Sequence, residues 1–269
     1  MMTSVPQRIV CLSAEVADWL WRLGAWHRVV GVTAWFEMPP EAASKPRISG
    51  FSSVGMDQLL ALDPDLVIGF SDVQADIAAE LIRQGCTVLT TNQRTLKEIE
   101  EALILIARSV GCESAAEPLL EEFRGKLFPV ELQGQRLRVY FEEWNDPLVA
   151  GIAWVGELIE RAGGEDIFAD LRSCGKALDR VVKPEDVLAA RPQIILGSWC
   201  GKPFLPDEVA ARPEWRNLPA IQHDEIYEIR GADILQPGFR LVFGYKKIID
   251  ILSNSAQHLQ MPDLQSRAH

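Results

Sequence analysis

The sequence is poor in the residues that build metal centres and disulfide frameworks. Its 269 residues include only four histidines and five cysteines. The cysteines are odd in number, widely spaced and never in a Cys-x-x-Cys pair, so they match neither a disulfide framework nor a zinc site. The histidines are dispersed too, whereas a bare metal ion needs convergent histidines and carboxylates. The sequence therefore predicts no metal site.

Membrane-spanning runs and common catalytic motifs are also missing. No apolar run approaches the roughly 18 residues of a membrane span. No Gly-x-Gly-x-x-Gly or Gly-x-Ser-x-Gly motif occurs, and the segment 197–203 departs from the phosphate-loop pattern. Cys200 is the candidate nucleophile at a strand end, but nothing in the sequence links His223 to it. We therefore predict no catalytic residues and keep an enzyme as the less favoured alternative.

Basic residues are outnumbered by acidic ones, 27 to 38, which gives a net charge of −11. An acidic surface repels phosphate backbones, so we expect no nucleic-acid partner. Exposed carboxylates do suit docking against a basic protein surface. The hydrophobic fraction of 48% is ordinary for a globular chain with room for two cores.

One unit of sequence occurs twice. The stretch 56–70 recurs at 184–198, and Pro64 matches Pro192 at an offset of 128 residues. Each copy reads as a short helix, a turn at the proline and a buried strand. The same offset relates the strand-like run at 8–12 to residues 136–140. The spacing is too wide for a solenoid and predicts two similar α/β lobes.

The rest of the pattern alternates strands with helices. Strands are expected at 8–12, 28–32, 66–68, 86–89, 136–141, 194–197 and 225–229. Helices are expected at 13–23, with Ser13 as N-cap, at 73–84, at 95–110 after a capping box, and at 113–130, 153–162, 206–211 and 238–252. Residues 33–51 are expected to form a surface loop and 142–152 an aromatic loop. The predicted domains are an N-terminal lobe at 6–112, a linker helix at 113–133, a C-terminal lobe at 134–255 and a polar tail at 256–269.

Several segments carry a resemblance to a known family. They are 8–12, 29–32, Pro39-Pro40, 54–57, 62–67, 162–168 and 184–188. Their order resembles the substrate-binding proteins of ABC importers for cobalamin, haem and ferric siderophores, over about residues 8 to 252. The cobalamin-binding branch looks closest. The resemblance implies two Rossmann-like α/β lobes joined by a single long linker helix, as in class III periplasmic binding proteins.

The resemblance also implies a membrane partner. In that family an acidic residue on each lobe docks against arginines of the permease, and the matching positions here are Asp57 and Glu185. The internal repeat pairs the same two positions. The first of them is often glutamate in the family, and here it is the shorter aspartate. The alternative explanation needs no partner, because a lone carboxylate in the first turn of a helix is stabilised by the helix dipole. We expect a monomer that docks to an ABC permease.

Aromatic residues indicate the kind of ligand. In open α/β sheets, ligands gather at the carboxyl ends of the strands, where this sequence places several of its aromatic residues. We predict that these bind a large flat ligand by stacking: Trp35, Phe51, Phe70, Trp144, Trp154, Trp199 and Phe204. Trp19, Trp21, Trp26 and Trp215 are assigned to packing or surface. Cobalamin or a related corrinoid fits best, without an intrinsic cofactor, whereas no motif marks arginines for an anionic siderophore.

The cellular location stays open at this point. The resemblance implies a periplasmic or cell-surface protein. The N-terminus shows no basic stretch, apolar core or cleavage site of a secretion signal, so we expect either a removed leader or a cytoplasmic protein. The alternative function is therefore a cytoplasmic corrinoid or tetrapyrrole carrier or sensor without a transporter.

Overall fold

Two units make up the fold. The structure is a computed structural model that describes residues 5–37, 39, 40, 42–132 and 134–260. Unit 1 comprises Met1–Gly125 with Gln236–Arg240, and unit 2 comprises Lys126–Leu235 with Leu241–His269. Positions 38 and 41 of the predicted loop, 133 of the predicted linker helix and 261–269 of the predicted tail lie outside the described residues.

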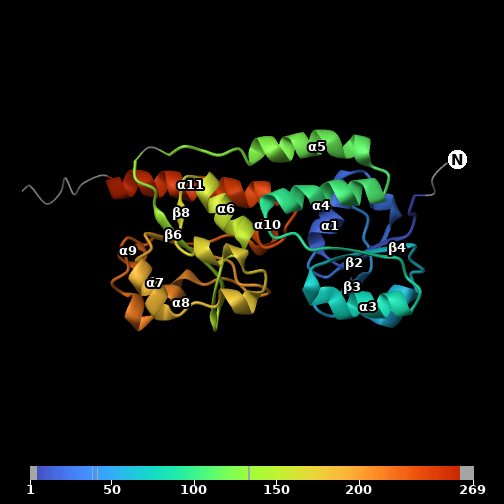
Figure 1. The fold of residues 1–269 in the computed structure, drawn as a ribbon, viewed down its shortest axis with the longest axis horizontal. Coiled ribbons are helices and arrows are strands. Elements are labelled where there is room, and N and C mark those ends of the chain that lie inside the picture. The colour runs from blue at the N-terminus through green and yellow to red at the C-terminus, as the bar shows by residue number, and fades with distance from the viewer. Residues whose placement is uncertain (1–4, 38, 41, 133, 261–269) are drawn as a thin grey trace, which may run out of the picture. The chain divides into compact units, whose positions relative to one another are not determined.

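Unit 1 is built on a parallel sheet with strand order β3-β2-β1-β4-β5 (Figure 1). Its strands are β1 (Ile9–Cys11), β2 (Val29–Thr33), β3 (Arg47–Ser49), β4 (Leu66–Phe70) and β5 (Val88–Thr91). Its helices are α1 (Ala14–Arg22), α2 (Met56–Leu60), α3 (Ala75–Arg83), α4 (Leu96–Ser109) and α5 (Glu113–Lys126), with 3-10 turns η1 (Trp26–Arg28) and η2 (Asp72–Gln74). The alternation of strands and helices produces the α/β class that the sequence predicts.

Helix starts in unit 1 follow the sequence signals closely. At α4 the predicted capping box is confirmed, since Thr95 Oγ1 accepts from the Glu98 N–H at 3.2 Å and the Glu98 carboxylate accepts from the Thr95 N–H at 3.1 Å. Ser13 holds the N-cap position of α1 with extended backbone, but its hydroxyl makes no capping bond. The apolar side of α1 carries Trp19, which is fully buried and donates its indole N–H to Leu103 O of α4.

Two strands of unit 1 differ from the prediction. The loop expected at 33–51 contains β3, whose Ile48 is buried and which pairs with β2. Three residues are too few for a periodic pattern, so the sequence does not reveal this strand. The strand expected at 86–89 lies two residues later, as β5.

A short segment from the C-terminal half packs in unit 1. Phe239 stacks on Trp19 with ring centres 6.2 Å apart, and the Arg22 guanidinium lies 4.3 Å from the Phe239 ring. Gly238 leaves no room for a side chain, because an added Cβ would lie 2.6 Å from Glu15 Cβ. The chain thus supplies part of the unit 1 core from residues far beyond its N-terminal half.

Unit 2 contains a mixed sheet of order β10-β9-β6-β7, with β8 paired to β6. Its strands are β6 (Arg138–Asn145), β7 (Leu148–Ala150), β8 (Glu165–Asp166), β9 (Ile194–Gly197) and β10 (Ile226–Glu228). Its helices are α6 (Ala153–Arg161), α7 (Pro184–Ala190), α8 (Pro206–Ala210), α9 (Pro219–Gln222), α10 (Gly231–Ile234) and α11 (Leu241–Gln260), with 3-10 turns η3 (Ala169–Ser173), η4 (Ala177–Arg180) and η5 (Pro213–Trp215).

The aromatic loop predicted at 142–152 is wrong for most of its length. Strand β6 continues to Asn145 and returns through β7 as an antiparallel hairpin. Trp144 therefore lies within a strand instead of following one. The sequence reads as a loop here because Asp146-Pro147 and Gly151 interrupt it, but the first pair forms only the turn of the hairpin.

The two long connecting helices also differ from their predicted bounds. Helix α5 ends at Lys126, so the linker helix predicted at 113–133 is too long. Helix α11 runs from Leu241 to Gln260 instead of 238–252, so residues 256–260 of the predicted tail are helical. Ser255, near that end of α11, is buried and its hydroxyl bonds to the Glu225 carboxylate. Among the described residues, no helix combines the length and apolar character that crossing a membrane requires.

The repeated unit is visible in the backbone, with one correction. Ile9 of β1 pairs with Leu66, and Val139 of β6 pairs with Ile194. Leu66 and Ile194 are 128 residues apart (194 − 66), whereas Ile9 and Val139 are 130 apart (139 − 9). The predicted match of 8–12 with 136–140 is therefore wrong by two residues, because additional residues lie between the first strand and the repeated unit in unit 1 relative to unit 2.

Candidate functional site

The carboxyl edge of the unit 1 sheet carries aromatic residues, because parallel strands all end at the same edge. Trp35 follows β2 and is 50% exposed, and Phe51 follows β3 and is 38% exposed. Phe70 is the last residue of β4 and is buried. Two of the three predicted ligand contacts of this unit thus present open ring surface.

A buried glutamine fixes this edge. Gln74 Nε2 donates to Leu12 O at 3.1 Å and to Phe51 O at 2.9 Å, while its Oε1 accepts from the Phe70 N–H at 2.9 Å. One side chain therefore joins the segments after β1 and β3 to the end of β4. Sequence reasoning missed Gln74, since a glutamine in a short turn carries no motif.

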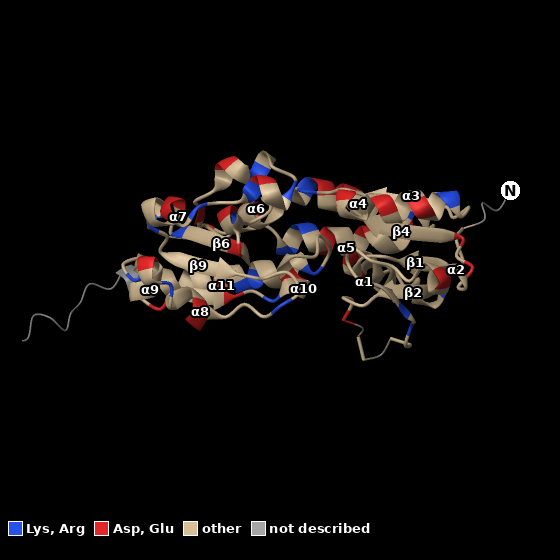
Figure 2. Cartoon of the chain, turned by 90° about the horizontal axis from the view of Figure 1, so that it is seen from below, with Lys and Arg blue, Asp and Glu red and all other residues tan. Residues whose placement is uncertain are grey.

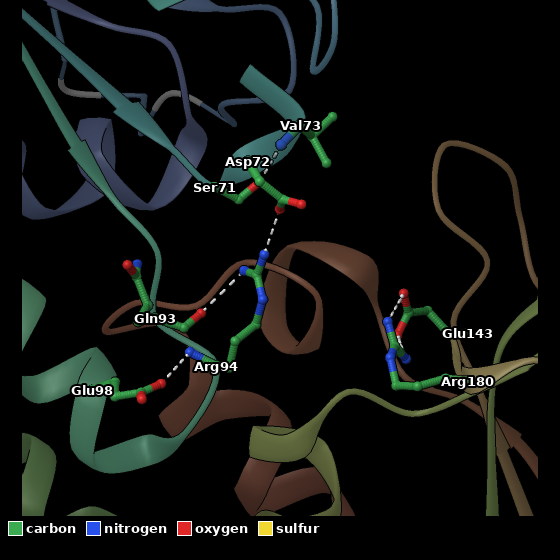
Figure 3. A network of polar contacts seen from close by, with 8 residues as sticks. All are labelled: Ser71, Asp72, Val73, Gln93, Arg94, Glu98, Glu143 and Arg180. Atoms are coloured by element: carbon green, nitrogen blue, oxygen red, sulfur yellow. Dashed lines mark hydrogen bonds and ion pairs between the residues drawn. The ribbon is translucent and has the colours of Figure 1, made fainter. Parts of the chain in front are cut away.

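An arginine lies beside Phe70. The Arg94 guanidinium is 5.3 Å from the Phe70 ring centre and forms an ion pair with Asp72 at 2.9 Å (Figure 3). Its backbone N–H donates to the Glu98 carboxylate at 2.7 Å, which anchors the segment at the start of α4. The charge of Arg94 is thus already neutralised by a carboxylate.

In unit 2 the predicted aromatic residues Trp144, Trp199 and Phe204 lie in one cluster. The rings of Trp199 and Phe204 meet edge to face, with centres 5.0 Å apart. Both are buried, whereas Trp144 is half-buried. The Lys202 ammonium lies 4.4 Å from the Trp144 ring centre and 4.6 Å from that of Trp199. Phe204 and Lys202 therefore both contact the ring of Trp199.

A buried ion pair sets the orientation of Trp199. Its indole N–H donates to Glu142 Oε1 at 3.0 Å, and the fully buried Glu142 carboxylate receives two bonds from Arg212, at 2.7 and 2.8 Å. Arg212 in turn lies 4.4 Å from the Trp215 ring centre. None of these partners carries a sequence motif, and they are up to 70 residues apart.

Trp154, the remaining predicted ligand contact of unit 2, lies in the core, and two arginines of the unit lie in ion pairs. Trp154 is buried and donates its N–H to Ile234 O at 2.8 Å, so its ring packs inside the unit. Arg180 is buried and forms a two-bond pair with Glu143 (Figure 3). Arg172 is held by Asp166 and Glu160. Of the tryptophans assigned to packing or surface, Trp19, Trp26 and Trp215 are buried.

The two predicted docking residues are equivalent in position. Asp57 is in the first turn of α2 and Glu185 in the first turn of α7, and both side chains are exposed. Figure 2 marks the acidic residues of these helices in red. The hydrogen bond at the start of α7 comes from Asp186, which accepts from the Lys183 N–H at 3.1 Å. Glu185 is therefore not needed for capping.

The chemistry of Cys200 disfavours a nucleophilic role. Although Cys200 is exposed, partial desolvation of its thiol, and secondarily the nearby Glu143 carboxylate, raises the pKa of that thiol. A protonated thiol is a poor nucleophile and a poor metal ligand. Within the described ranges, histidines, cysteines and carboxylates form no group able to hold a metal ion.

These features define a class of protein: a two-unit α/β binding protein with aromatic residues at the strand ends. The chain belongs to the periplasmic binding protein family, whose model matches residues 9–232. It is a substrate-binding protein of the ABC-importer type.

Curated relatives and solved structures extend this comparison. A vitamin B12-binding protein of Vibrio cholerae is 23% identical over 256 residues, 91% of this chain and 89% of the relative. A cobalamin-binding protein of Halobacterium salinarum is 28% identical over 180 residues, 64% of this chain and 49% of the relative.

The periplasmic vitamin B12 binding protein BtuF of Vibrio cholerae superposes with a TM-score of 0.71 at 22% identity, over 94% of this chain and 98% of that one. The periplasmic haem-binding protein RhuT from Roseiflexus sp. RS-1 gives a TM-score of 0.77 at 21% identity, over 93% and 99%. These structural likenesses concern the fold.

Proposed function

We propose that this protein captures a large flat metal chelate, a corrinoid such as cobalamin, and delivers it to an ABC permease. The observation that carries the proposal is the set of aromatic residues at the carboxyl edge of each sheet, with Trp35, Phe51 and Trp144 offering ring surface. Flat apolar ligands are held by such rings, with a few polar groups for orientation. The names of the relatives from Vibrio cholerae and Halobacterium salinarum favour a corrinoid over other chelates.

The proposal narrows the predicted contact set. Phe70, Trp154, Trp199 and Phe204 are buried, so we assign them to supporting positions. Phe204 packs so closely over Gly197 that a Cβ there would overlap its ring. Direct contact is proposed for Trp35, Phe51 and Trp144.

Delivery to the permease is proposed to use Asp57 and Glu185. Both are exposed carboxylates in the first turn of equivalent helices. There a carboxylate is favourably placed by the helix dipole and can accept two bonds from an arginine of the partner. The protein itself is proposed to carry out no catalysis.

The test is a titration of the purified protein with cyanocobalamin, haemin and a ferric siderophore, followed by tryptophan fluorescence. Trp144→Ala and Trp35→Ala should each weaken binding of the corrinoid by about 1–3 kcal/mol, the usual scale for an aromatic anchor. The matched control is Trp21→Ala, since Trp21 is half-buried at the C-terminal end of α1, away from the carboxyl edge. Equal losses in all three variants would contradict the assignment, and no binding of any chelate would remove the proposal.

A further inference from the structure

One lysine in unit 2 is held between two indole rings. Lys202 Nζ lies 4.4 Å from the Trp144 ring centre and 4.6 Å from the Trp199 ring centre, and it donates to Asn145 Oδ1 at 2.7 Å. Cations are attracted to the faces of aromatic rings, most strongly to tryptophan. The ammonium group therefore has a defined position at the carboxyl ends of β6 and β9, although the lysine is exposed.

Both rings are fixed by their own hydrogen bonds. The Trp144 N–H donates to Asp146 O at 2.9 Å, and the Trp199 N–H donates to Glu142 Oε1 at 3.0 Å. Glu142 is itself held by Arg212. A flexible side chain would ordinarily lose much conformational freedom on meeting a ligand. Here the protein has already restricted Lys202 before any ligand arrives.

The charge of Lys202 is not paired with either of the two carboxylates nearest to it in the sequence of β6. The neighbouring acids Glu142 and Glu143 are engaged by Arg212 and Arg180. In the part of the chain that the structure describes, no carboxylate lies within ion-pair distance of Lys202 Nζ. An ammonium has three donors, of which Asn145 takes one. Two N–H donors and a full positive charge thus remain for a ligand.

Lys202 also determines what a ligand can reach. Trp199 is only 4% exposed, so its ring is closed to a ligand while Lys202 lies over it. Trp199 then acts on a ligand through Lys202, as a positioning residue. The group that this edge presents is a cation flanked by the half-buried ring of Trp144.

We propose that Lys202 is an anion-recognition residue, and that the chelate carries a carboxylate or phosphate that accepts a hydrogen bond from Lys202 Nζ. This inference rests on the proposed function. It adds a charge requirement: a flat chelate with an anionic substituent is preferred over the same chelate without it. Charge-assisted hydrogen bonds of this kind are the strong ones.

The test uses two pairs of probes. Haemin carries two carboxylates and haemin dimethyl ester none, whereas cyanocobalamin carries a phosphodiester that dicyanocobinamide lacks. Lys202→Met keeps the length of the stem and removes the charge. The comparison is made in the pair of probes that the protein binds. There, Lys202→Met should lower the affinity for the probe with the anionic group about tenfold or more, and the affinity for the probe without it less than twofold. Lys202→Arg should restore most of the preference.

Lys247→Met is the matched control, since Lys247 is an exposed lysine of α11 in the same unit. It should leave all affinities unchanged. If Lys202→Met weakens both members of a pair equally, or neither, the charge requirement is wrong while the proposed function stands. If the unaltered protein binds none of the four probes, both the proposed function and this inference are wrong.

Discussion

Asp63 and Arg191 hold the same left-handed backbone conformation, with φ of 45° in each, at equivalent positions of the two units. Each precedes a proline, and each carbonyl accepts a hydrogen bond from an arginine at the start of a strand. Arg8 Nε donates to Asp63 O at 2.9 Å, and Arg138 Nη2 donates to Arg191 O at 3.0 Å. Both units thus lead into the strand of the repeated segment through the same turn, at positions that usually favour glycine. Arg191 is also the C-cap of α7, whereas α2 ends earlier, with Ala61 as its C-cap.

At Arg191, glycine should therefore be tolerated better than a residue with a side chain, which is the reverse of its effect inside a helix. Arg191→Gly is expected to leave the free energy of unfolding unchanged or to raise it by up to about 1 kcal/mol, because glycine adopts positive φ without strain. Arg191→Val should lower it by about 1–2 kcal/mol. At the neighbouring Ala190, the last residue of α7, glycine should cost about 1 kcal/mol. Urea unfolding measures all three, and an equal cost of glycine at both positions would refute the explanation.

Loss of Arg212 should destabilise unit 2 strongly. Arg212→Met leaves the fully buried Glu142 carboxylate without its cation, which typically costs about 3–5 kcal/mol. Adding Glu142→Gln should recover part of this loss, because the buried charge is then gone. Near-ultraviolet circular dichroism should report the altered setting of Trp199. Arg216→Met, at an exposed arginine nearby, serves as control and should change stability by less than about 0.5 kcal/mol.

Glu15 should make the stability of unit 1 depend on pH. Burial raises the pKa of Glu15 from 4.5 to about 7, and among the described residues its Oε1 has no hydrogen-bond partner. Between these values the folded protein binds more protons than the unfolded chain, so stability falls as pH rises from about 4.5 to 7 and then levels off.

The corresponding variant is Glu15→Gln, which stays neutral at every pH. Relative to it, the unaltered protein should lose about 2–3 kcal/mol of unfolding free energy between pH 5 and pH 8. The control is Glu113→Gln, at an exposed position in the first turn of α5. The difference in unfolding free energy between this variant and the unaltered protein should not change with pH over the same range. If the difference in unfolding free energy between Glu15→Gln and the unaltered protein is also independent of pH, the Glu15 carboxyl is solvated in solution.

Reversing the two exposed first-turn acids should uncouple the protein from its permease. Asp57→Lys with Glu185→Lys is expected to abolish uptake in vesicles reconstituted with a cobalamin permease, because each arginine that we propose as their partner would then face a like charge. Ligand affinity and melting temperature should stay within error, since exposed charges contribute about 0–1 kcal/mol.

The control for this experiment is a second pair of first-turn acids. Asp76 of α3 and Asp207 of α8 are also exposed, one in each unit. Asp76→Lys with Asp207→Lys makes the same change in net charge and should leave uptake intact. Equal loss of uptake in both double variants would attribute the effect to net charge and remove the specific docking role.

Local signals in the sequence account for much of the fold. The capping box at Thr95 and the proline at the repeated turn are each read from a few adjacent residues, and the structure has both. The strand at 47–49 was missed because its pairing with β2 comes from tertiary contact. The two-residue error in aligning 8–12 with 136–140 has a related cause, since strand register depends on partners distant in the sequence.

The candidate site was less accessible to prediction. The pattern of aromatic residues predicts Trp144 as a ligand contact, but it does not predict the hairpin that carries this residue. Burial of Trp199 depends on Glu142 and Lys202, of which the first is 57 residues away. The chemistry of this edge thus arises from side chains that only the fold brings together, and polar residues such as Gln74 and Lys202 have no periodicity to mark them.

The packing of Phe239 on Trp19 bears on the order in which this protein can fold during synthesis. The described strands of unit 1 are all synthesised by residue 91, yet the Phe239 side chain that stacks on Trp19 is not synthesised until residue 239. Unit 1 is therefore a late-maturing part of the chain despite being made first. A chaperone that recognises exposed aromatic side chains would find its binding site near α1 while Lys126–Leu235 of unit 2 is being synthesised.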